Sequence, residues 1–159
     1  MKSKELFLSS IGACIATLLA SFFSDTLLAA DGLHVLLAST GASALVIFGL
    51  PFSPVSRPWN LVGGHFVSAL VGVACYQWIP YPVLGVAIAT GGSMLLMGWC
   101  RCMHPPGAAT AISAIVGGET IHHLGYAFVV VPVMVNSIIL LSVAMAVATF
   151  RERNPFYDD

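Results

Sequence analysis

The sequence predicts an all-α integral membrane protein with six membrane segments. Its 159 residues are 58% apolar and only 8% charged, with a mean hydropathy of +0.92. An average soluble domain is about 25% charged. No Asp, Glu, Lys or Arg occurs between Arg57 and Arg101, or between Glu119 and Arg151. A soluble fold could not cover its surface with so few charges, and the net charge of −1 without a basic cluster argues against a nucleic-acid partner.

The first two segments are residues 6–23 and 33–50. A bilayer crossing takes about 20 apolar residues, so both are close to spanning length. The first follows Lys2 and Lys4 as a secretory signal would, but it is longer than a signal core, and we expect it to be retained. The second contains the small-residue run 39–46, which makes it a candidate short or interrupted helix.

The third and fourth segments are residues 61–79 and 83–100, each of spanning length. Proline-rich breaks at 51–60 and 78–82 precede them, and a third break at 101–106 follows the fourth segment. We therefore expect two long helices joined by a tight turn.

The fifth segment, residues 107–118, follows Pro105 and Pro106. Consecutive prolines cannot lie inside a helix, but they can open one, so we expect a helix of small residues to begin at Pro106. At about 1.5 Å per residue it covers only about half of a 30 Å hydrocarbon core. The free N–H groups of its first turn, at Gly107, Ala108 and Ala109, form a candidate anion site near mid-membrane. We expect Gly107→Leu to block passage there without unfolding the protein.

The sixth segment, residues 124–150, is long enough to cross with tilt. With six crossings every basic residue falls on one side, and the acidic Asp25, Asp31 and Glu119 fall on the other. Because Lys and Arg are in excess in cytoplasmic loops, we expect both termini to be cytoplasmic. The lack of an Arg- and Ser-rich presequence before Leu6 favours a bacterial inner membrane. The basic residues are Lys2, Lys4, Arg57, Arg101, Arg151 and Arg153.

Residues 39–46 are similar in character to residues 105–112. This indicates a single transmembrane domain over 1–159, built from two inverted three-helix repeats at 3–79 and 80–153, the plan of many transporters. Ordinary close helix packing through Gly, Ala, Ser and Thr is the alternative explanation.

Several motifs resemble one family over nearly the whole chain. They are His104-Pro105-Pro106-Gly107-Ala108-Ala109-Thr110-Ala111, Gly41-Ala42-Ser43-Ala44, Ser53-Pro54 with Arg57-Pro58-Trp59-Asn60, and Gly63-Gly64-His65 with Ser68-Ala69-Leu70-Val71-Gly72. In this order they resemble the HPP family of integral membrane proteins. The resemblance implies a small helical membrane protein, and plastid and cyanobacterial members are associated with nitrite transport.

We therefore expect a transporter or channel for a small inorganic anion, nitrite by resemblance, at half-helix N-termini near the bilayer midplane. Such a small chain is expected to form a homo-oligomer that shields its polar backbone, without a cofactor. Arg57 would attract the anion at the inner mouth, although such an arginine is also a common topology determinant. The candidate substrate-binding residues are Ser39, Thr40, Gly41, Ala42, Ser43, Asn60, His65, His104, Pro105, Pro106, Gly107, Ala108, Ala109, Thr110 and Asn136.

The polar candidates each have a structural alternative. His104 either gates, carries a proton or donates to an anion, since an imidazole titrates near pH ~6.5, or it only caps the backbone beside the prolines. His65 and Asn136 lie inside predicted spans, where polar side chains either serve function or join helices. Ser39, Thr40 and Ser43 likewise either face the anion or pack helices.

Two metal-binding alternatives stay open, and no catalytic set is apparent. A sulfur-rich stripe suits Cu(I) if the fourth helix continues to His104, although Met and Cys also pack as apolar side chains. Glu119, His122 and His123 also combine metal-ligand types, but adjacent histidines in a loop are usually only solvated. A copper transporter and a non-transporting assembly or regulatory module are thus the alternative functions. The stripe is Met94, Met97, Cys100, Cys102, Met103 and His104.

Overall fold

The computed structural model describes residues 3–29, 36–151 and 155–156, and all regular structure within these ranges is helical. The prediction of an all-α membrane protein is confirmed at that level: four helical stretches are long and apolar enough to cross a bilayer. The helices are α1 (Ser3–Ala29), α2 (Ala38–Gly49), α3 (Pro58–Trp78), α4 (Pro82–Trp99), α5 (Pro106–Val116), α6 (Gly118–Leu124) and α7 (Val135–Ala148), with a 3-10 turn η1 (Pro54–Ser56) and a wide π turn η2 (Val129–Met134).

Prolines set the starts of three helices. Pro58, Pro82 and Pro106 open α3, α4 and α5, because the first-turn N–H that proline lacks has no intrahelical partner anyway. These three helices therefore begin within three residues of the predicted segments 61–79, 83–100 and 107–118.

The second and fifth helices are short. With 12 and 11 residues, α2 and α5 are about 18 and 17 Å long at ~1.5 Å per residue, roughly half of a hydrocarbon core. The predicted second segment, 33–50, starts outside the described residues, and its helix begins only at Ala38.

The predicted sixth segment, 124–150, contains a helical stretch of spanning length, 129–148, but it is not one continuous helix. Helix α6 ends at Leu124, and Gly125 turns the chain with a φ of +50°, which a residue without Cβ adopts readily. Val131 then leaves helical geometry before Pro132, whose ring and missing N–H disrupt a regular helix. Residues 119–123, between the fifth and sixth segments, lie within the short helix α6.

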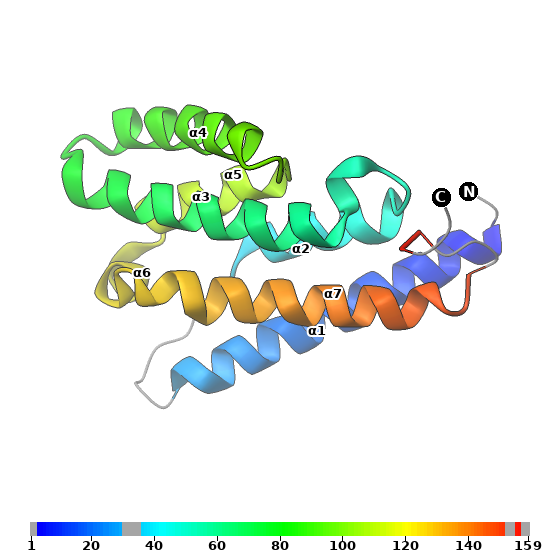
Figure 1. Cartoon of the computed structure of the whole chain (residues 1–159). Coiled ribbons are helices and arrows are strands. Elements are labelled where there is room, and N and C mark those ends of the chain that lie inside the picture. The colour runs from blue at the N-terminus through cyan, green and yellow to red at the C-terminus, as the bar shows by residue number, and fades with distance from the viewer. Residues whose placement is uncertain (1–2, 30–35, 152–154, 157–159) are drawn as a thin grey trace.

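Helix α3 is the most buried of the long helices, whereas α1 and α4 expose most of their length. It packs most extensively on α5 and also contacts α4 and η2 (Figure 1). On the other side of the bundle α1 packs along α7. Exposed apolar side chains such as Phe7, Leu18 and Val83 on α1 and α4 are suited to lipid contact.

The start of α1, the start of α3, and the ends of α4 and α7 lie at one end of the bundle (Figure 1). Arg151 fastens this end, donating to Ser9 Oγ at 2.9 Å and to the Phe48 carbonyl at 3.1 Å. Trp59 Nε1 donates to the Cys100 carbonyl at 3.1 Å, which joins α3 to the end of α4.

The described basic residues therefore collect at this end, while Asp25 and Glu119 lie at the other, near the end of α1 and on α6. The predicted segregation of charge is present in the described part of the chain. Lys2, Asp31 and Arg153, which belong to the same prediction, lie outside it.

Candidate functional site

A cluster of polar side chains is buried where α2, α3 and α5 meet. Ser43 on α2, His65 on α3, Thr110 on α5 and His104 just before α5 are each at most 3% exposed. Polar groups at such a depth are costly unless they are paired, so their partners decide what the site can do.

These side chains form one hydrogen-bonded chain. Ser43 Oγ lies 2.6 Å from His65 Nε2 and 3.0 Å from His104 Nε2, so one hydroxyl bridges two imidazoles. His65 Nδ1 lies 2.7 Å from Thr110 Oγ1. The centroids of the two imidazole rings are 5.0 Å apart.

The far end of the chain fixes its direction. His104 Nδ1 lies 2.8 Å from the Val55 carbonyl, which can only accept, so this nitrogen carries hydrogen. In neutral His104, Nε2 then accepts from the Ser43 hydroxyl, and Ser43 Oγ accepts from His65 Nε2–H. His65 Nδ1 is left to accept from the Thr110 hydroxyl, so every donor points the same way.

Two glycines let the His104 loop lie directly on α3. A Cβ on Gly64 would come within 2.6 Å of His104 Cβ, and one on Gly63 within 2.9 Å of Cys102 Cβ. Asn60 Nδ2 fastens the same loop by donating to the Met103 carbonyl at 2.8 Å. Asn60, a predicted binding residue, is thus used to position His104.

A second polar group joins α1, α2 and α7. Asn136 Nδ2 donates to Thr40 Oγ1 at 2.9 Å, and Ser24 Oγ donates to Asn136 Oδ1. Ser24 was not predicted. A signal for it exists in the sequence, because the buried residues Gly12, Ala16, Ala20 and Ser24 recur every fourth position along α1.

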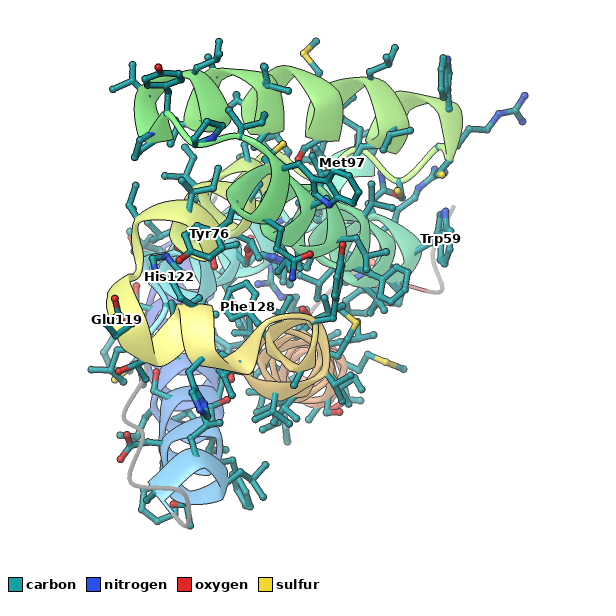
Figure 2. The ribbon with its side chains drawn as sticks, turned by 90° about the vertical axis from the view of Figure 1, so that its left-hand side faces the viewer. Trp59, Tyr76, Met97, Glu119, His122 and Phe128 are labelled. Carbon is teal, nitrogen blue, oxygen red and sulfur yellow. The ribbon has the colours of Figure 1, made fainter. Side chains whose placement is uncertain are left out.

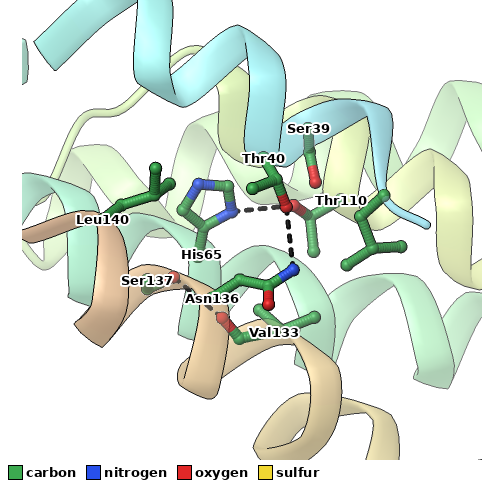
Figure 3. Close-up of a pocket in the computed structure, with 9 residues that line it drawn as sticks. Ser39, Thr40, His65, Thr110, Val133, Asn136, Ser137 and Leu140 are labelled. Atoms are coloured by element: carbon green, nitrogen blue, oxygen red, sulfur yellow. Dashed lines mark hydrogen bonds between the residues drawn. The ribbon is translucent and has the colours of Figure 1, made fainter. Parts of the chain in front are cut away.

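The two polar groups face a common cavity of about 10 Å³ between α2, α3, α5 and α7 (Figure 3). A volume of ~10–15 Å³ holds about one water molecule. Five predicted binding residues line it together with four that were not predicted. The lining is Leu37, Ser39, Thr40, His65, Thr110, Val133, Asn136, Ser137 and Leu140.

The backbone donors differ from the expectation. The amides of Gly107 and Ala108 donate to the carbonyls of His104 at 2.8 Å and Pro105 at 3.1 Å, because the chain already turns at the two prolines. Residues 41–43 lie in the interior of α2, which begins at Ala38, and there amides bond within the helix. Side chains rather than these amides therefore face the cavity.

Gly107 itself serves close packing. A Cβ there would meet Ser68 Oγ at 2.7 Å and the Gly64 carbonyl at 3.0 Å. The structure therefore does not support the expectation that Gly107→Leu leaves the fold intact. Pro105 is exposed, Gly41, Ala42, Ala108 and Ala109 are half-buried, and Arg57 is exposed beside η1.

The structure does not bring together the ligands of either metal-binding alternative. Helix α4 ends at Trp99 and Arg101 has a φ of +52°, so the fourth helix does not continue to His104 as a shared copper-binding face requires. His122 stacks on Tyr76 with ring centroids 3.7 Å apart and bonds the Ile115 carbonyl (Figure 2). The described residues contain no group of three or more His, Cys, Asp or Glu side chains placed to hold a metal ion.

Comparison with known proteins extends over nearly the whole chain. The family described as HPP, transmembrane region, matches residues 1–156. A transmembrane protein of Dictyostelium discoideum is 36% identical over 128 residues, which cover 78% of this chain and 45% of that protein. A second from the same organism is 36% identical over 125 residues, 76% of this chain and 40% of its own length. The chain thus spans less than half of these relatives, and no solved structure matches it.

Proposed function

The chain belongs to the HPP family of transmembrane proteins, and from that premise we propose that it moves a small monovalent anion, nitrite by family resemblance, across a bilayer. The route passes the cavity between α2, α3, α5 and α7. The observation that carries the proposal is the buried polar set on that cavity: the imidazole of His65, the hydroxyl of Thr110 and the amide of Asn136.

This polar set suits an anion better than a cation. Neither α2, α3, α5 nor the stretch from η2 through α7 contains Asp or Glu, so no carboxylate on these elements repels an anion. When they turn from their partners within the protein to a bound anion, hydroxyl, amide and imidazole N–H groups replace the hydration that the anion loses on leaving water. A small cavity lined this way favours a small monovalent solute.

The packing of α1 and α4 supports an inverted repeat. Contacts of α1 with α7 are matched by contacts of α4 with α3, and contacts of α1 with α2 by those of α4 with α5. The short helices α2 and α5 contact each other between the two halves. In this proposal all six segments cross, with the basic end in the cytoplasm.

Sidedness of labelling tests this topology. Cys100 is exposed beside the basic end, whereas Glu119 lies at the opposite end on α6. With Cys14, Cys75 and Cys102 replaced by serine, we expect a membrane-impermeant maleimide to label Cys100 only after permeabilisation of whole cells. In a variant that also carries Cys100→Ser and Glu119→Cys, labelling should occur in intact cells. Labelling of both positions from one side would contradict the six crossings.

A hollow of about 260 Å³ provides the approach to the cavity from the acidic end. It shares Leu37 with the central cavity, and this side chain is only 7% exposed. Leu37 therefore separates the two spaces. The hollow is lined by Leu36, Leu37, Ala38, Ser113, Val116, Gly117, Thr120 and Ile121.

Truncating this barrier tests the route. We expect purified protein in proteoliposomes to take up nitrite faster than protein-free liposomes, and Leu37→Ala to raise that rate about threefold or more. Leu45→Ala removes the same atoms from an exposed position of α2 and should leave the rate unchanged. Wild-type uptake no faster than that of protein-free liposomes, with nitrite, nitrate and formate alike, would overturn the proposed function.

A further inference from the structure

We infer that Thr110, His65, Ser43 and His104 form a proton relay that couples anion movement to proton movement. The coupling rests on the proposed anion transport for its second solute. The relay itself rests on the continuous hydrogen bonds of 2.7, 2.6 and 3.0 Å that link these four side chains. Ser43 is the bridging member, because its hydroxyl oxygen joins the two imidazoles.

The ends of the relay reach different places. Thr110 and His65 line the central cavity. At the other end His104 bonds Val55 of η1, a half-buried residue flanked by the exposed Pro54 and close to the basic end of the bundle. A proton passing along the four side chains therefore travels between the cavity and that surface.

Each transfer balances. A proton from a cavity water joins Thr110 Oγ1 as the Thr110 hydrogen passes to His65 Nδ1, forming an N–H bond there. The Nε2–H bond of His65 breaks as Ser43 gains that hydrogen, and the earlier Ser43 hydrogen passes to His104 Nε2. When the His104 ring turns away from the Val55 carbonyl toward the η1 surface, its Nδ1–H bond breaks and the proton leaves to water there. One proton enters and one leaves, and nothing is oxidised. Each imidazole ends with its hydrogen on the other ring nitrogen, so a turn of both rings together with rotation of the hydroxyls restores the starting order.

The helices around the relay carry no charged side chain, so the imidazoles and the anion control the proton transfer. No Asp, Glu, Lys or Arg occurs on α2, α3, η1, η2, α5 or α7. A protonated imidazole repels a second proton on its neighbour 5.0 Å away and attracts an anion in the cavity. Binding of proton and anion is therefore mutually favourable, which is the condition for cotransport. The other titratable groups on these elements and the described parts of their adjoining loops are Arg57, Cys75, Tyr76, Tyr81, Cys100, Arg101, Cys102, Tyr126 and Arg151.

Ser43→Ala tests the relay because it removes the bridging hydroxyl with little change of volume. Full-length protein is reconstituted with a pH-sensitive dye inside, and nitrite is added outside at clamped membrane potential. We expect wild-type vesicles to acidify as nitrite enters, and protein-free vesicles to report diffusion of the neutral acid. Ser43→Ala should lower proton-coupled net uptake at least tenfold while keeping exchange of labelled for unlabelled nitrite at equal pH, which needs no net proton transfer.

A matched variant and a second lesion complete the experiment. Ser93→Ala removes a hydroxyl that is equally buried on α4 and has no partner among the described residues, so it should behave as wild type. If the Ser43→Ala protein fails to fold, His104→Gln takes its place in the test. A glutamine side chain cannot carry a proton between two partners, so this variant should show the same loss of proton-coupled uptake.

The outcomes separate the two proposals. Wild-type nitrite exchange without acidification, or Ser43→Ala and His104→Gln proteins that acidify as wild type does, would overturn the relay and leave the anion route standing. Potential-driven proton entry without nitrite flux, abolished by Ser43→Ala, would support the relay and overturn the anion route. Neither nitrite nor proton movement in folded wild-type protein would overturn both.

Discussion

Gly72→Ala is expected to separate α3 from α5 and to lower the free energy of unfolding by about 2–3 kcal/mol, at the upper part of the range for overpacking. A Cβ at this position would lie 2.5 Å from the Ala111 carbonyl oxygen, 2.7 Å from Ala111 Cα and 2.9 Å from Ala114 Cβ. The first two obstacles are backbone atoms, so no side-chain rotation relieves the clash. The α3–α5 contact is the most extensive in the bundle.

Denaturant titration in detergent micelles measures this loss, and Gly91→Ala is its matched control. Gly91 lies on α4 with nothing within 4 Å of an added Cβ, so alanine there should be neutral or stabilise by up to ~1 kcal/mol through helix propensity. Equal stability of the two variants would mean that α3 and α5 do not approach as closely as the structure places them. Because Thr110 precedes Ala111, Gly72→Ala should also impair transport.

The membrane class and most helix boundaries were predictable because they depend on local chemistry. Runs of apolar residues without charge fix where a chain can cross lipid, and Pro58, Pro82 and Pro106 fix where helices begin. The error at 124–150 arose where apolar character continues through a turn. Hydropathy cannot distinguish an unbroken helix from one interrupted at Gly125 and Pro132.

The members of the site were more predictable than their geometry. His65, Ser43, Thr110 and Asn136 stand out as polar side chains in apolar segments, which is a signal any single sequence carries. Their partners depend on how distant segments pack. The Val55 carbonyl has no sequence signal, because every residue has a carbonyl, and only the folded η1 turn places it against His104.

The bonding of the backbone amides at the start of α5 could not be predicted for the same reason, because it depends on how the chain folds before the helix. A helix that begins after Pro105 has free first-turn N–H groups in principle, but the preceding turn brings the His104 and Pro105 carbonyls back to the amides of Gly107 and Ala108. The direction of a loop decides this, and composition does not encode it. The buried polar groups that remain for a solute are therefore side chains. Substitutions of residues with hydroxyl or imidazole groups, rather than of glycines, are thus expected to impair binding of the solute.

The last prediction follows from the size of the central cavity, which at about 10 Å³ holds a water but not a bent triatomic anion such as nitrite. On the proposed route the structure is closed at this point, so we expect passage to require a movement of α2 away from α7. Thr40 Oγ1 and Asn136 Nδ2 lie 2.9 Å apart across that contact. In a protein with its native cysteines replaced by serine, we expect Thr40→Cys with Asn136→Cys to be joined by a thiol cross-linker.

Cross-linking should reduce nitrite flux to the level of protein-free liposomes, and a reducible linker should let a thiol reductant restore it. Each single-cysteine variant has whatever flux its own substitution leaves, and the same treatment should not lower that flux further, because no second thiol is present to bridge. This comparison separates loss of movement from loss of the Thr40 hydroxyl and the Asn136 amide. Undiminished flux through a fully cross-linked protein would show that the anion passes without parting α2 from α7. The water-sized cavity would then mark a packing defect between helices rather than a closed point on the route.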